Sequence, residues 1–388
     1  MPAKIGAVAA FALVCVLALA PACVLGDELP ADPAAAMPAT TAPAPSNGRL
    51  THYFYEGRKY GSEQLVHPLR TIVNGGLGIL QLDNRDDRVD EIDFKHGWQI
   101  VSKNVGNPIA SIENEGWDRF LKQEIAPFST SVEGARYWPN YTLHVVGGGM
   151  SYRLCAEWFD YHGSSHPRLL AAGTIFAYHV LNEVVEGADY TGYTTDPVAD
   201  LMVFDPLGIV LFEFEGVSRF FGKTLSMAEW SYQPIYDPVT HRLENVGQNF
   251  VVRYPFPGAL NRWSLMYTFG THGEMGLSKK FDNGDSWSFC GGFGASTLQD
   301  LGDGVRTVDL VPAAGLFWDR HNSLMASLLY AKTKAYQWRL NLYPGVLPLG
   351  APMPGLFVAA SHEGRLAAGV TIGALPGIPV GIGGTVSD

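Results

Sequence analysis

Apolar and polar positions follow two different periods along the chain, and the change comes near residue 248. From residue 141 to residue 223 the apolar positions run in blocks that are typical of buried helices. After residue 248 large side chains alternate with small or polar ones, which is the pattern of β-strands with two different faces. We therefore predict an α+β fold, with an N-terminal helical block followed by an antiparallel β-meander.

The clearest helix is predicted over residues 168–187. Its first half is almost wholly apolar, but this run is shorter than the roughly 20 residues that a helix needs to cross a bilayer. We therefore expect the helix to be buried in protein. Its second half carries His179, Glu183 and Glu186, whose offsets of four and three residues place them on one face.

A weaker helix is predicted before it, over residues 143–163. This segment carries His144, but it also contains Gly147, Gly148 and Gly149, which disfavour a helix. Glycines have no Cβ, so they also allow a second backbone to approach closely.

A third helix is predicted to start at Asp196, where an Asp-Pro pair is a good start signal. Asp200 and Asp205 follow among apolar residues, and a carboxylate in such surroundings must be paired, hydrogen-bonded or neutralised. Pro206 lacks a backbone N–H, so we expect a kink just after Asp205.

These helices offer five candidates for catalysis, which are His144, His179, Glu183, Asp200 and Asp205. Side chains from facing helices converge on a bundle core, and perturbed acids and bases are typical of active sites. A purely structural polar network between the helices is the alternative. The set of His179, Glu183 and Glu186 lacks the paired spacing of a zincin helix, so we predict no metal and no cofactor.

The β-region is predicted over residues 248–375, as a hairpin meander. Its clearest strand places Trp287 and Phe289 on one face and Ser288 and Cys290 on the other. In a soluble sandwich one face would carry Lys, Glu and Asp, whereas here the second face is mostly small and uncharged. We therefore favour an outer-membrane-type barrel of about eight strands, with lipid outside. A soluble sandwich or barrel is the alternative.

The composition favours the lipid-facing interpretation. Aromatic residues make up 12% of the chain and 44 residues are glycine, while only 17% are charged, against about 25% in a typical soluble domain. The net charge of −11 and the lack of a basic patch exclude nucleic acid as a partner. Outside the first 26 residues only Cys155 and Cys290 remain, which excludes a disulfide framework.

The predicted organisation has six parts. They are a signal peptide (1–26), a Pro/Ala linker (27–48), the helical domain (49–223), a linker loop (224–247), the barrel-like domain (248–375) and a Gly/Pro-rich tail (376–388). A lipoprotein signal that uses Cys23 is the alternative for the leader. We expect secretion across the inner membrane, to the outer membrane or the periplasm.

Several short motifs resemble an uncharacterised bacterial envelope family. They are Tyr60-Gly61-Ser62-Glu63, His67-Pro68-Leu69, Pro139-Asn140-Tyr141-Thr142-Leu143-His144, Asn182-Glu183 and Thr195-Asp196. The resemblance spans most of residues 50–375 and implies a signal peptide, a helical block and a C-terminal β-region, without an activity. The helical order of His, Glu and Asp also distantly resembles the VanZ-like membrane proteins, with Asp205 near an Asn place and one extra residue after Asp200. That resemblance implies Glu183, Asp200 and Asp205 as site residues.

Two functions are consistent with these patterns. The first is a structural or transport-related envelope protein, in which the helical block plugs or caps the barrel. The second is an envelope enzyme that modifies lipid or glycan. In the enzyme His144 or His179 would act as base, Glu183 would orient it, and Asp200 or Asp205 would assist.

Overall fold

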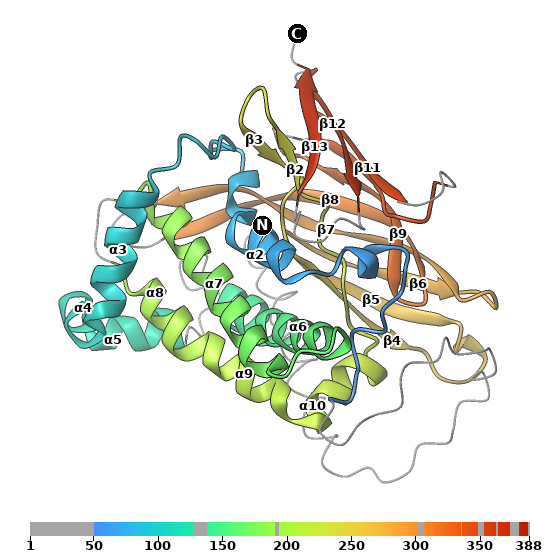
Figure 1. Ribbon diagram of the computed structural model, residues 1–388, viewed down its shortest axis with the longest axis horizontal. Helices are drawn as coiled ribbons and strands as arrows, with labels where there is room; N and C mark the ends of the chain where they lie inside the picture. Colours follow the sequence, from blue (N-terminus) through green and yellow to red (C-terminus); the bar gives the residue numbers. More distant parts are fainter. Residues whose placement is uncertain are drawn as a thin grey trace.

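The computed structural model describes residues 50–126, 138–190, 194–300, 306–334, 336–347, 353–361, 364–372 and 380–386. The predicted signal peptide and linker lie outside these residues. Within them, a block of helices packs beside one large twisted sheet (Figure 1). The predicted α+β class and its order, helices first and strands second, are therefore confirmed.

The first part of the helical block is made of short helices. They are η2 (Ser62–Leu65), α2 (Pro68–Gly76), η3 (Gly78–Gln81), α3 (Phe94–Gly106), α4 (Pro108–Glu115), α5 (Trp117–Phe120) and η4 (Leu121–Ile125). The second part holds the candidate residues. It consists of η5 (Trp138–Gly148), α6 (Gly149–Tyr161), α7 (Pro167–Gly187), α8 (Asp196–Ala199), η6 (Asp200–Phe204), α9 (Asp205–Glu213), α10 (Glu215–Arg219) and η7 (Phe220–Thr224).

The helix predicted over residues 168–187 is confirmed as α7, whereas its two neighbours are more broken than predicted. The segment with His144 is a π-helix, η5, that passes into α6 at the three glycines. The segment after Asp196 changes from α to π geometry at Asp200 and back to α at Asp205, and it bends out of the helix at Phe214. Pro206 has no N–H for a helical bond, and the wider π-turn stands just before it.

The strands form one 13-stranded sheet. They are β1 (Ala228–Glu229), β2 (Ile235–Asp237), β3 (Arg242–Glu244), β4 (Asn249–Pro255), β5 (Trp263–Gly270), β6 (His272–Lys280), β7 (Asp285–Asp300), β8 (Arg306–Arg320), β9 (Ser323–Ala331), β10 (Trp338–Leu342), β11 (Pro354–Ala360), β12 (Leu366–Ile372) and β13 (Gly381–Val386). From β4 to β13 each strand pairs with the next in antiparallel fashion, which confirms the predicted meander.

The sheet does not close on itself, so the closed barrel of about eight strands is not what the described strands form. Its order runs from β1 through β4–β13 to β2 and β3. The edge of β4 pairs with β1, and the edge of β13 pairs in parallel with β2. Both β1 and β2 come from the segment that we expected to be a linker loop. The free edges of the first and last long strands are therefore covered by one short stretch of chain.

The predicted tail is also partly wrong, because Gly381–Val386 forms β13. Its register with β12 places Gly383 opposite Gly369, and Ile235 packs against both glycines. Added Cβ atoms there would meet Ile235 at 2.4–2.5 Å, so glycine is required by this close packing. The glycines of this segment therefore belong to a tightly packed strand.

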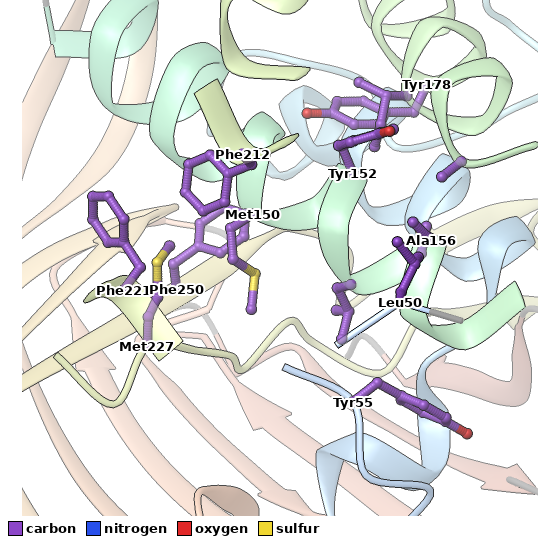
Figure 2. Close-up of a cluster of buried hydrophobic side chains, with 14 of the residues drawn as sticks. Leu50, Tyr55, Met150, Tyr152, Ala156, Tyr178, Phe212, Phe221, Met227 and Phe250 are labelled. Atoms are coloured by element: carbon purple, nitrogen blue, oxygen red, sulfur yellow. The ribbon is translucent and has the colours of Figure 1, made fainter. Parts of the chain in front are cut away.

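The helical block and the sheet share a hydrophobic cluster (Figure 2). Met150 of α6 and Phe212 of α9 pack with Phe221 of η7 and Phe250 of β4. Met227, which lies between η7 and β1, belongs to the same cluster. Such shared burial favours folding as one unit, because neither part covers these side chains alone. Among the described helices, none has both the length and the apolar character to cross a membrane.

Candidate functional site

Three helical segments bring four of the five candidates together. His144 comes from η5, His179 from α7, Asp200 from the start of η6, and Asp205 from the start of α9. All four lie in the interior of the block. The π-helical geometry of η5 and η6 falls at these residues, and π-turns inside helices are frequent at functional sites.

Two glycines allow the segments to approach this closely. A Cβ at Gly208 would lie 2.8 Å from the carbonyl oxygens of His144 and Val145, and a Cβ at Gly149 would lie 2.7 Å from the carbonyl oxygen of Gly208. These contacts are with backbone, which cannot rotate away. Glycine at both positions therefore lets α9 lie directly against η5 and α6, and this contact places Asp205 beside His144.

Asp205 lies between the two histidines. Its Oδ1 is 3.1 Å from Nδ1 of His144, and its Oδ2 is 2.7 Å from Nδ1 of His179. The imidazole rings are 4.7 Å apart and tilted by 30°. On its other side His144 faces Asp200, with 3.3 Å between Nε2 and Oδ2. One ligand atom from each of His144, His179 and Asp205 lies within 4.8 Å of the other two, so these three side chains could hold a metal ion.

Not every close atom pair in this site is a hydrogen bond. His144 and Asp205 share one, but the mutual orientation of His179 Nδ1 and Asp205 Oδ2 does not meet hydrogen-bond geometry in spite of their short separation. Oδ1 of Asp200 is likewise buried without a hydrogen-bond partner among the described residues. A buried polar atom without a hydrogen-bond partner costs free energy, so the presence of each such atom in a folded protein needs a physical reason.

The surroundings drive the pKa values of the two histidines apart. Burial disfavours a charge on His144, but Asp200 and then Asp205 outweigh it and raise the pKa to about 9. Burial lowers the pKa of His179 to about 4, although Asp205 acts in the opposite direction. The site thus pairs a protonated His144 with a neutral His179 near pH 7, which is the arrangement that acid and base chemistry requires.

The pKa values of the carboxyl groups also shift in different directions. Burial raises the pKa of Asp200 to about 8, with His144 acting against it. Burial also opposes the charged form of Asp205, but the neighbouring His179 and His144 hold its pKa below its usual value. Burial, followed by the charge on Asp200, raises the pKa of Glu183 well above its usual range. Glu183 is therefore part of the acidic surroundings of Asp200, and the contact with the histidines belongs to Asp205.

Glu157, another buried carboxylate of the helical block, lies in a separate network. It accepts hydrogen bonds from the backbone N–H groups of Tyr53, Phe54 and Tyr55, and from Arg153 at 3.1 Å. It holds residues 53–55 to α6 and is structural. Sequence reasoning missed Tyr178, whose buried ring packs against His179 with 3.7 Å between centroids. Its position within an apolar run gave no signal.

Searches for relatives found no matching family model, no matching curated protein and no matching solved structure.

Proposed function

We propose that this protein is a bacterial cell-envelope protein whose sheet is embedded in the outer membrane, with the helical block as a cap that the sheet anchors. The observation that carries this proposal is the exposed face of the meander. Strand register joins apolar residues into one row across the sheet, in the order Leu265, Leu277, Phe289, Leu316, Leu328, Leu340, Val358 and Ala368.

Large members of this face are open to the surroundings. Phe289 is 64% exposed, Trp287 48% and Ile382 70%. The residues that alternate with Trp287 and Phe289 along β7, such as Ser288 and Cys290, point to the opposite face of the sheet and are buried. An apolar surface of this extent is unfavourable in water and marks contact with a membrane or a partner. In a membrane β-structure, apolar side chains that face the lipid alternate along each strand with small or polar side chains that face inward.

The inner face is filled by protein. Gln233 donates to the Leu342 carbonyl oxygen at 3.1 Å, and Tyr343 donates to the Ser231 carbonyl oxygen at 2.9 Å. Arg253 and Asp319 form a buried ion pair at 2.9 Å across it. Two cavities near His272 have volumes of about 20 Å³ each, which is room for about one water molecule. These contacts favour an anchoring role for the sheet over a wide aqueous channel.

Membrane fractionation tests this proposal. The full chain would be expressed with its leader, and the membranes would be washed with carbonate. We expect the protein to stay with the outer-membrane fraction and to change its gel mobility when boiled, as folded membrane β-structures do. Release into the soluble periplasm by the wash would contradict the embedding, and the exposed face would then need a protein partner.

A second candidate function is an envelope enzyme that modifies lipid or glycan, and the His144–Asp205–His179 arrangement favours it. In this mechanism the neutral His179 acts as general base. Asp205, rather than Glu183 as expected from the sequence, is the carboxylate in contact with both histidines. The protonated His144 can donate a proton, with Asp200 beside it.

Complementation of a deletion strain tests the enzymatic candidate. If the site is catalytic, His179→Gln should fail to restore the envelope phenotype although the protein reaches its normal level in the membrane. The control is His96→Gln, which removes a histidine outside the site whose ring bonds to the Tyr190 carbonyl oxygen at 2.7 Å. Full rescue by His179→Gln would exclude this enzyme and leave the anchored structural protein.

A further inference from the structure

We infer that His144, His179 and Asp205 form a binding site for one divalent transition-metal ion of the zinc type. The inference does not depend on the embedding of the sheet, because all three residues belong to the helical block. It is an alternative to the metal-free acid and base pair described above, because nitrogens that bind an ion cannot also donate or accept the proton. It goes against our expectation from the sequence, which considered ligands on a single helix. The three ligands come from η5, α7 and α9, and their spacing in sequence carries no metal signature.

The distances suit such an ion. Nδ1 of His144 and Nδ1 of His179 lie 3.1 and 2.7 Å from the two oxygens of Asp205. In a tetrahedral zinc site with bonds of about 2.0–2.2 Å, ligand atoms are about 3.3–3.5 Å apart. The three ligand atoms lie within 4.8 Å of one another, so the histidines and Asp205 would need to shift by about 1 Å to surround a bound ion.

The unpartnered atoms point to an ion at this position. His179 Nδ1 and Asp205 Oδ2 are both fully buried and face each other without a hydrogen bond. A cation between them would accept the lone pair of the imidazole and neutralise the carboxylate at once. That explains why two buried polar atoms approach to 2.7 Å in an orientation that does not share a proton well.

The local charge favours a cation as well. Asp205, Asp200 and Glu183 are all buried around the two histidines. The neighbouring charges that act most strongly on Asp200 and Glu183 come from His144 and from acidic groups, including Asp196 and Glu186. Several carboxyl groups in a dry interior repel one another, and a bound divalent ion offsets this repulsion.

Asp200 is not one of the three ligands, but it lies next to His144. With Nδ1 of His144 directed to the ion, its Nε2–H faces Oδ2 of Asp200, which lies 3.3 Å away. A carboxylate behind a metal-bound histidine fixes the tautomer and strengthens the ligand. Two imidazoles and one carboxylate suit zinc and its neighbours better than calcium or magnesium, and three protein ligands leave a fourth position for water. His144, whose side chain is 12% exposed, is the most open ligand.

Metal content of the purified full-length protein tests the inference. After dialysis against Zn²⁺ and removal of free ion, we expect about one zinc per wild-type chain by mass spectrometry. Asp205→Asn and His179→Gln should lower this to under about a tenth, and Asp200→Asn should weaken Zn²⁺ binding by about 10- to 100-fold. The control is His272→Gln, which removes a buried histidine of the sheet that bonds to Tyr232. It should retain the full zinc content.

A second measurement keeps the test decisive if the site variants fail to fold. Co²⁺ bound to the wild type should give the strong visible absorption of a four-coordinate nitrogen and oxygen site, and X-ray absorption of the zinc form should show two imidazoles. Wild-type protein that retains no Zn²⁺ and gives no Co²⁺ spectrum would overturn the inference. Equal zinc retention by a folded double variant, His144→Gln with His179→Gln, would overturn it too.

Discussion

Glu183 and Glu157 are both buried glutamates of the helical block, but their surroundings differ. Glu157 accepts three backbone N–H groups and the guanidinium of Arg153, which itself is fully buried. Glu183 lies in a dry region where the charge of Asp200 adds to the effect of burial. Burial raises the pKa of both carboxyl groups, but at Glu157 the backbone donors and Arg153 act against this shift, whereas at Glu183 the neighbouring acidic groups add to it. Substitution should therefore have opposite results at the two positions.

Replacement of Glu157 should strongly destabilise the fold. Glu157→Ala leaves the buried Arg153 with Glu215 as its remaining carboxylate partner and removes the acceptor of three backbone N–H groups, so we expect a loss of about 3–5 kcal/mol in the free energy of unfolding. Chemical denaturation of the detergent-solubilised protein measures it. The exposed Glu113 on α4 provides the control, and Glu113→Ala should change the value by less than about 0.5 kcal/mol. A loss below about 1 kcal/mol at Glu157 would contradict a clamping role.

Replacement of Glu183 should change the pH dependence of stability. Its pKa in the folded protein is raised, so the folded state binds the proton more tightly than the unfolded chain does. The resulting stability is complete below about pH 4.5 and is lost as the pH rises through the raised pKa. Glu183→Gln stays neutral, so its melting temperature should rise relative to wild type from pH 5 to pH 9, measured with chelator present. A constant difference between the two proteins across that range would contradict this prediction.

At the scale of elements, the site depends on the contact of α9 with η5 and α6. The residues that permit this contact are glycines. A Cβ at Gly208 would press on the backbone of η5, whereas a Cβ at Gly173 on α7 would meet nothing within 4 Å. The two helical glycines thus form a matched pair. One is required by tertiary packing, and the other only lowers the propensity of its helix.

Alanine at these two positions should act in opposite directions. Gly208→Ala should destabilise the protein by about 1–3 kcal/mol, because α9 must move away from the carbonyl oxygens of His144 and Val145. Gly173→Ala should stabilise it by up to about 1 kcal/mol through helix propensity. Thermal denaturation of the two variants compares them. Equal stability of both variants would show that α9 does not need the close approach that positions Asp205.

At the scale of the whole molecule, the sheet turns many large apolar side chains outward, such as Phe289 and Leu316. Its inward face combines small or polar residues with buried apolar ones, such as Met266 and Phe317. Phe289 on β7 and Val239, in the turn between β2 and β3, are 64% and 84% exposed. In water a charge would be tolerated at both positions. In a bilayer only the charge at Phe289 would face hydrocarbon.

The substitutions Phe289→Arg and Val239→Arg test whether the exposed face of the sheet contacts water or lipid. In phospholipid vesicles we expect Phe289→Arg to lower the free energy of unfolding by about 2–4 kcal/mol, as for a cation placed on the lipid face of a membrane β-structure. Val239→Arg should stay within about 0.5 kcal/mol of wild type. Urea titration of the folded, vesicle-bound protein measures both. Small and equal effects would indicate that the exposed face does not contact lipid.

The sequence by itself determined the local structure wherever one period dominated. The long apolar run with Gly187 at its end specified α7 as a helix, but not its burial. Leu169 and Leu170 in its first turn are 71% and 44% exposed, so the expectation that the whole helix is buried in protein is wrong for this end. The alternation around Trp287 and Phe289 specified β7 and the faces of the meander, since side chains of a strand point alternately to opposite sides. It also named five polar candidates, because polar groups are costly at apolar positions, without separating His144, His179 and Asp205 from Glu183 and Asp200.

Only the tertiary structure decided how these parts combine. Whether β4 and β13 pair with each other depends on contacts between residues far apart in the chain. In the structure they do not pair, because β1 pairs with β4 and β2 pairs with β13. The partner of the histidines could not be chosen from spacing either. Asp205 reaches both of them because Gly208 and Gly149 let backbones meet, and that distance is a property of packed helices rather than of any one segment.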